Sequence, residues 1–228
     1  MKKLITTIAM VATACISVHA QGTVIFNNTT TTKLSTNSVV GGAATGLTAA
    51  STGGAPLYYY LLFTAAAGTT VGGNTGSVIQ TTPGNFSGFV FNNASGWTAQ
   101  TGIMGTNAAA GKFLSSNPNG DGSSSLSIAG GSSTAFVVLA WSANLGANLS
   151  ALEASLATPG ITGWLGESAI GTETPGIPGS TSPTGLFGTV SPAITPFTIG
   201  MATTVPEPTT LALAALGGAS LLLLRRKK

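Results

Sequence analysis

The sequence LYYYLLFT at residues 57–64 is an apolar run in which the side chains do not alternate with polar ones. A strand with this pattern is apolar on both faces, so we expect it at the centre of the core. FVVLAW at residues 136–141 is a second apolar run. Further short β-rich runs, separated by Gly, Asn, Ser and Pro clusters, lie at residues 23–27, 78–81, 86–91, 163–170 and 194–199. The pattern predicts a mostly β protein with an antiparallel β-sandwich body.

Two local features refine this prediction. Pro196 cannot donate a hydrogen bond to a neighbouring strand, so the run at 194–199 is expected at a sheet edge. One short helix is predicted to begin at a capping box formed by Ser150 and Glu153 and to end at Pro159-Gly160. Its apolar side carries Leu149, Leu152 and Leu156.

The charge of the chain is concentrated at its two ends. Only 6% of the 228 residues are charged, and the formal net charge is +3. Residues 21–208, however, contain two lysines, no arginine and five acidic residues, so this body is close to −3. A surface that binds nucleic acid needs several clustered cations, and nucleic acid is therefore not an expected partner.

The N-terminus has the three parts of a secretory signal peptide. Lys2-Lys3 is followed by an apolar run at residues 4–14, and Val18-His19-Ala20 places the signal peptidase cut between Ala20 and Gln21. Eleven apolar residues are too few for a stable membrane-spanning helix. The alternative is a lipoprotein signal, in which Cys15 would be acylated.

Removal of this segment limits the chemistry of the mature chain. Cys15 and His19 are the single cysteine and the single histidine of the sequence, and both precede the predicted cut. The mature chain then has no thiolate nucleophile, no imidazole base and none of the softer ligands of zinc, copper and most iron sites. The sequence predicts no catalytic residues and no metal or other cofactor.

The last 24 residues read VPEPTTLALAALGGASLLLLRRKK. The uncharged run at 211–224 predicts a transmembrane helix that is slightly short for a bilayer, a deficit that thinning and snorkelling offset. The positive charges that follow should remain in the cytoplasm and stop transfer, leaving the body outside. They are Arg225, Arg226, Lys227 and Lys228. A plain tail anchor is the simpler alternative.

The order of Pro206-Glu207-Pro208, apolar helix and basic tail resembles the PEP-CTERM sorting domain of exported bacterial proteins. The resemblance implies that an exosortase, a membrane-embedded cysteine transpeptidase, recognises these three residues and processes the chain near them. It also implies an association with exopolysaccharide and biofilm matrix. The two prolines fix φ and remove backbone donors, which keeps the motif extended for capture in a groove. Glu207 would present one charge to a recognition cation.

Other candidate sites in the body have simpler interpretations. Asn117, Asn119 and Asp121 have the spacing of half a calcium loop, but Ile128 stands where a bidentate Glu belongs, which favours a plain turn. Nothing pairs the carboxylates across a cleft as a glycosidase requires, whether Asp121, Glu153, Glu167 or Glu173. Core packing explains the main aromatic residues better than a sugar-stacking surface does: Tyr58, Tyr59, Tyr60, Trp97, Trp141 and Trp164.

The sequence thus predicts a signal peptide at 1–20, a β-sandwich-like exported body at 21–204 and a sorting domain at 205–228. The predicted function is that of a non-catalytic cell-surface or extracellular-matrix protein, whose precursor is anchored in the inner membrane. The alternative is a secreted β module that binds carbohydrate or ice. Expected partners are exosortase and signal peptidase as processing enzymes, the membrane and exopolysaccharide.

Overall fold

The computed structural model describes residues 21–39, 43–51, 55–71, 80–81, 86, 88–92, 96–116, 118–188 and 194–204. The predicted signal helix at 1–20 and the predicted transmembrane helix at 211–224 lie outside these residues. Within the described residues, no helix has the length and apolar character needed to cross a membrane.

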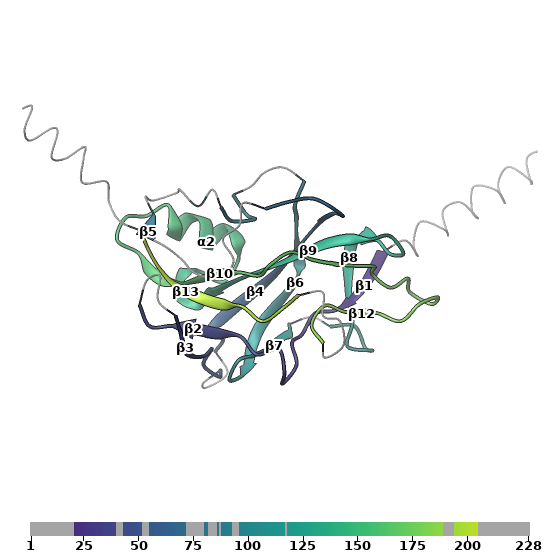
Figure 1. Ribbon diagram of the computed structural model, residues 1–228, viewed down its shortest axis with the longest axis horizontal. Coiled ribbons are helices and arrows are strands. Elements are labelled where there is room, and N and C mark those ends of the chain that lie inside the picture. Colours follow the sequence, from purple (N-terminus) through teal and green to yellow (C-terminus); the bar gives the residue numbers. More distant parts are fainter. Residues whose placement is uncertain are drawn as a thin grey trace, which may run out of the picture.

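The described chain is mostly β with one short α-helix, as predicted (Figure 1). The helical segments are α2 (Leu149–Leu156) and the 3-10 helix η1 (Ala143–Leu145). The strands are β1 (Gln21–Ile25), β2 (Ser35–Asn37), β3 (Ala44–Leu47), β4 (Tyr58–Ala66), β5 (Gln80–Thr81), β6 (Thr98–Ala109), β7 (Lys112–Ser115), β8 (Ser124–Ala129), β9 (Thr134–Ser142), β10 (Thr162–Glu167), β11 (Gly171–Glu173), β12 (Thr184–Gly185) and β13 (Thr198–Thr204).

The strands form two sheets. A ten-stranded sheet has the order β3-β2-β13-β10-β9-β4-β6-β7, with β11 added to β9 and β5 added to β13. A three-stranded sheet has the order β12-β1-β8. Most neighbours are antiparallel, but β1 with β12, β13 with β2 and β13 with β5 are parallel. The expectation of a wholly antiparallel body is wrong for these pairs, because each joins segments far apart in the chain instead of the two arms of a hairpin.

β4 and β9 are the central strands, and their side chains are buried on both faces. They pair continuously from Tyr58 with Ser142 to Ala66 with Thr134. One face carries Tyr60, Leu62 and Val138, which pack in a core with residues of β1 and β8. The other carries Leu61, Leu139 and Trp141, which pack in a second core with residues of α2 and η1. The apolar run at 57–64 therefore lies at the centre, as its sequence predicts.

The segment at 86–91 differs from its prediction. Its described residues, 86 and 88–91, form turns instead of a strand: Phe89 N donates to Phe86 O, and Asn92 N donates to Phe89 O. Phe86, Phe89 and Val90 are buried in the second core. The apolar side chains are buried against one face of the sheet, so this run does not need to pair as a strand to remove them from water.

The ends of β13 and α2 also differ from their predictions. β13 begins after Pro196, so the proline takes no part in pairing, and the strand lies between β2 and β10 instead of at an edge. The N-cap of α2 is Asn148, not Ser150, because the Asn148 Oδ1 accepts the bond from Ala151 N at 2.9 Å. The amide oxygen caps the helix two residues earlier than the hydroxyl that the sequence pattern favours.

Backbone bonds around Gly111 join the two ends of the large sheet. Leu34 N donates to Gly111 O at 2.9 Å, Gly111 N to Thr48 O at 2.8 Å, and Thr48 N to Leu34 O at 3.1 Å. Leu34 precedes β2 and Thr48 follows β3, whereas Gly111 turns the chain between β6 and β7. Gly111 has a φ of +73°, and a side chain there would meet the Lys33 Cβ at 2.9 Å. The curled sheet is therefore closed by a contact that requires glycine.

Asn28 holds this closure from inside. Its Nδ2 donates to Thr32 O and to Gly111 O, both at 2.8 Å, and its Oδ1 accepts from Phe113 N at 2.8 Å. Asn28 is only 3% exposed, so water cannot replace these partners. This one amide ties the N-terminal segment to the β6–β7 turn.

We expect Asn28→Ala to lower the free energy of unfolding by about 3 kcal/mol, since Thr32 O and Phe113 N lose their partner and Gly111 O keeps only the bond from Leu34 N. Urea denaturation of the purified protein measures this change. Asn119→Ala is the matched control, because Asn119 is exposed and its side-chain amide donates to the hydroxyls of Ser123 and Ser125. Equal stability losses in the two variants would contradict the role assigned to Asn28.

Candidate functional site: the end of the body and the C-terminal segment

The last described residue, Thr204, is fixed to the turn between α2 and β10. Its backbone N donates to Ile161 O at 2.9 Å, and its O accepts from Gly160 N at 2.8 Å. Its Oγ1 donates to Thr158 O at 2.6 Å and accepts from Ile161 N at 2.9 Å. Thr204 is only 2% exposed. The folded body thus extends as far as the residue before the predicted sorting domain.

Most residues of the predicted sorting and processing sites lie outside the described residues. These are Ala20, Pro206, Glu207, Pro208, Arg225, Arg226, Lys227 and Lys228. Gln21, on the mature side of the predicted signal cut, is the exposed first residue of β1 and pairs with Ala129 of β8. The mature chain proposed from the sequence would therefore begin at the first residue of the sheet.

A comparison with protein families identifies the segment after Thr204. Residues 204–227 match the family model of the PEP-CTERM protein-sorting motif. The chain carries a PEP-CTERM sorting motif. The match spans Pro206-Glu207-Pro208, the apolar run and most of the basic tail, and it begins at the residue that β13 fixes to the body. No curated protein and no solved structure matches the chain.

The predicted half calcium loop forms a polar turn in its described part. Asp121 Oδ1 accepts from the backbone N of Ser123 at 2.9 Å and from its Oγ at 2.7 Å. These bonds from Ser123 lower the pKa of Asp121. Asn119 directs its Nδ2 to Ser123 and Ser125, and Asn117 lies outside the described residues. Among the described residues, no three acidic, histidine or cysteine side chains group as metal ligands would.

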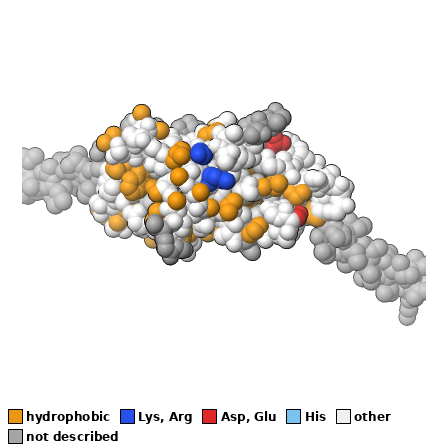
Figure 2. All heavy atoms as spheres, turned by 90° about the horizontal axis from the view of Figure 1, so that it is seen from below, with side chains coloured by type: hydrophobic (Ala, Val, Ile, Leu, Met, Phe, Trp, Pro, Cys, Tyr) orange, Lys and Arg blue, Asp and Glu red, His pale blue; other side chains and the backbone are white. Residues whose placement is uncertain are grey.

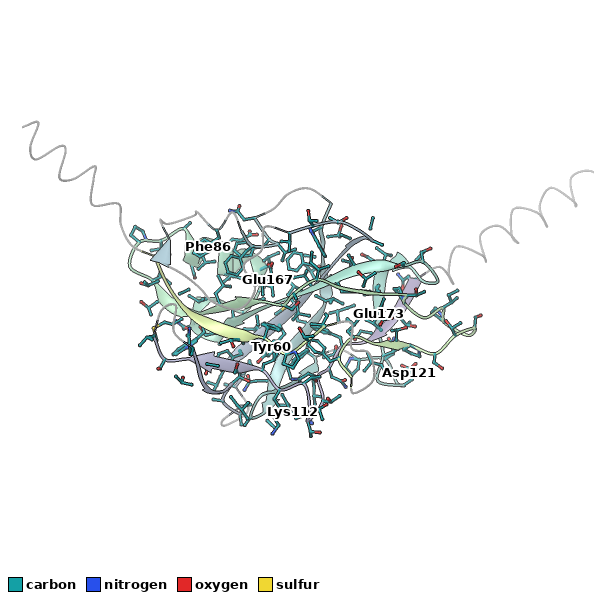
Figure 3. All side chains as sticks on the ribbon, in the orientation of Figure 1. Tyr60, Phe86, Lys112, Asp121, Glu167 and Glu173 are labelled. Atoms are coloured by element: carbon teal, nitrogen blue, oxygen red, sulfur yellow. The ribbon has the colours of Figure 1, made fainter. Side chains whose placement is uncertain are left out.

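The other candidate carboxylates belong to different elements. Glu153 lies on the exposed side of α2, Glu173 ends β11, and Glu167 ends β10. Figure 3 shows Asp121 and Glu173 toward one end of the molecule, with Glu167 beside Phe86 in its upper part. These carboxylates therefore lie on separate elements of the body.

The tryptophan side chains use their polar atoms within the body. Trp141 is fully buried, and its Nε1 donates to Gly146 O at 2.7 Å. Trp164 Nε1 donates to Asn37 O at 3.0 Å, and Trp97 Nε1 donates to Thr70 O at 3.1 Å. Aliphatic residues make up the large hydrophobic side chains that are exposed in the described part: Val39, Leu47, Leu57, Leu114 and Ile170. Packing thus accounts for these indoles, as the sequence favoured.

The most unusual polar group of the body is the Glu167 carboxyl group. Glu167 is 0% exposed, and its Oε2 accepts from Val90 N at 2.6 Å. Its Oε1 has no hydrogen-bond partner among the described residues. Burial raises the pKa of Glu167 from 4.5 to about 8, although the bond from Val90 acts in the opposite direction. The sequence from residue 72 to residue 95, which includes Val90, contains no charged residue.

The bond from Val90 N thus joins the covering turn around Val90 to β10 through a carboxyl group whose pKa is raised by burial. At neutral pH the protonated carboxyl group accepts the Val90 amide without a buried charge. In the sequence Glu167 is one of several acidic residues, and the pattern around it does not indicate that it is buried. The only local signal is its place at the end of GWLGE, where the neighbouring residues are uncharged.

We expect the protein to lose stability as the pH rises toward and through about 8, the pKa of Glu167 in the folded state. The folded protein holds the Glu167 proton more tightly than the unfolded chain, so its stabilising effect is complete only below about 4.5. Glu167→Gln should flatten this dependence and make the protein more stable than wild type above pH 8. Urea denaturation across this pH range measures both effects.

Glu153→Gln is the matched control for this test, since it removes a carboxylate from the exposed side of α2. A wild-type profile that stays flat through this range, or a fall that persists in Glu167→Gln, would contradict the assignment.

Proposed function

We propose that the protein is an exported, non-catalytic surface or extracellular-matrix protein that exosortase sorts through its C-terminal segment. The observation that carries the proposal is the family match at residues 204–227. In this proposal Pro206, Glu207 and Pro208 are recognised as substrate, the run at 211–224 holds the precursor in the membrane, and residues 225–228 remain in the cytoplasm.

The proposal also includes the N-terminal half of the export route. Residues 1–20 would be removed by signal peptidase, leaving Gln21 as the first residue of β1. The exported unit would be a sandwich-like body at 21–204, released to the cell surface or the extracellular matrix after C-terminal processing. Its low charge suits a surrounding of neutral, hydroxyl-rich polymer such as exopolysaccharide.

A cavity supports carbohydrate binding as a second candidate function. The cavity measures about 400 Å³ and lies between the turn before β8 and the loop before β12. Its lining combines a carboxylate, an amide, hydroxyls and prolines: Asp121, Asn119, Thr23, Ser123, Ser125, Thr181, Pro178 and Pro183. Such groups bond well to sugar hydroxyls. The cavity favours carbohydrate over ice, because ice recognition requires a flat, regular array.

The carbohydrate candidate is tested by adding a neutral oligosaccharide series to the protein and following its amide resonances. Shifts confined to residues 119–125 and 178–183, and lost in Asp121→Ala, would support the cavity as the site. Uniform or absent shifts at millimolar sugar would remove this candidate.

For the leading proposal, we expect Glu207→Ala to stop C-terminal processing while export continues. The apolar run and the basic tail are unchanged, so the chain should still insert. The body should still fold, because Glu207 follows its last strand. Intact mass and cell fractionation should show an uncut, membrane-retained chain without its signal peptide. Glu173→Ala, which removes a carboxylate from the body, is the control; normal processing of Glu207→Ala would reduce the segment to an anchor.

A further inference from the structure

The body and its sorting motif are joined without a linker. β13 pairs with β10 at Thr203–Thr162 and with β5 at Thr203–Gln80 and Thr204–Thr81. Both edges of the strand are therefore occupied at its C-terminal end. Thr204 also bonds to residues 158–161, so the C-terminal end of β13 is held in place on the body.

Covalent geometry then limits how far the motif can stand from the body. Only Val205 separates Thr204 from Pro206. Two residues span at most about 7 Å, so the Pro206 Cα lies within that distance of the Thr204 Cα. A protein that holds Pro206-Glu207-Pro208 in a groove must therefore approach the surface around Thr204.

That surface is the exit corner, which we define as residues 157–160 together with Thr162. These residues are exposed; Thr158 and Gly160 bond to Thr204, and Thr162 pairs with Thr203 of β13. The corner presents a methyl group, hydroxyls and a proline, and it has no charged side chain: Ala157, Thr158, Pro159, Gly160 and Thr162. The nearest acidic residue along the chain is Glu153, one helical turn earlier.

We propose that the exit corner is the part of the folded body on which the sorting enzyme docks when it engages the motif. This inference rests on the proposed function. Because the corner is uncharged, the facing surface of the enzyme should be neutral as well. A charge placed at the corner would be taken out of water without a partner, which is unfavourable in a close contact.

Ala157→Arg tests this contact without weakening the body. Ala157 is the exposed C-cap of α2, where a cation interacts favourably with the helix dipole. We expect the variant to be processed roughly tenfold more slowly than wild type in cells, followed by intact mass over time. Thr172→Arg places the same charge at the exposed residue of β11, which pairs with the end of β9 away from β10, and should be processed at the wild-type rate.

A spacer provides the second arm of the experiment. Twelve Gly and Ser residues inserted between Thr204 and Val205 would separate motif and body by roughly 20 Å on average. When the spacer is present, the chain with Ala157→Arg and the chain without it should be processed at equal rates, because the enzyme can reach the motif without contacting the exit corner. A slow rate in both contexts, or no effect in either, would overturn the docking surface; thermal unfolding of each variant verifies that the body is folded.

The proposed function fails in a different way. If the wild-type chain and Glu207→Ala are processed alike, or neither is processed, the motif has no role and the exit corner has no enzyme to meet. If Glu207→Ala blocks processing in both the direct and the spaced chain while Ala157→Arg has no effect, the sorting function stands and the docking surface is rejected.

Discussion

The body depends on one constraint: β4 and β9 pair along their whole length and are apolar on both faces. Such a pair is stable in water only when a layer covers each face. The three-stranded sheet supplies much of one layer, whereas α2, η1 and the turns at 86–91 supply the other. The remaining strands extend this central pair outward until the sheet curls and its ends meet at Gly111.

Neutral amide side chains join segments that are distant in the sequence, a role that ion pairs have in more highly charged proteins. Asn28 joins the N-terminal segment to the β6–β7 turn, and Asn107 Oδ1 accepts from Leu57 N and Tyr58 N at the start of β4. Gln100 bridges the sheets, since its Nε2 donates to Thr64 Oγ1 and its Oε1 accepts from Ser127 N. Figure 2 shows a small group of cationic side chains among scattered hydrophobic ones. The described residues contain two lysines, Lys33 and Lys112, and no arginine. The fold should therefore depend little on ionic strength.

The sequence predicted the apolar strands well and the polar ones poorly. Runs such as 57–64 and 136–141 indicate their own burial, and residues 162–167 also form the expected strand. β6 is the longest strand, but its sequence TAQTGIMGTNAA has weak alternation, because glycine and alanine lie where larger residues would mark a buried face. The phenylalanines at 86–91 indicated burial correctly but not conformation. Burial of Glu167 and bonding of Thr204 arise from contacts between distant segments, which local patterns do not report.

The position of β13 inside the sheet has a consequence for the order in which the body can form. β2 reaches the rest of the large sheet only through β13, so this early strand requires a partner made near the end of the chain, whereas β1 can pair with β8 before β12 is available. A chain that emerges from its N-terminus across a membrane cannot complete this sheet until residues 198–204 have also crossed. Such long-range pairing is slow to form. The topology thus makes completion of the large sheet wait for its last strand, although β4, β6, β7 and β9 can pair before that strand is available.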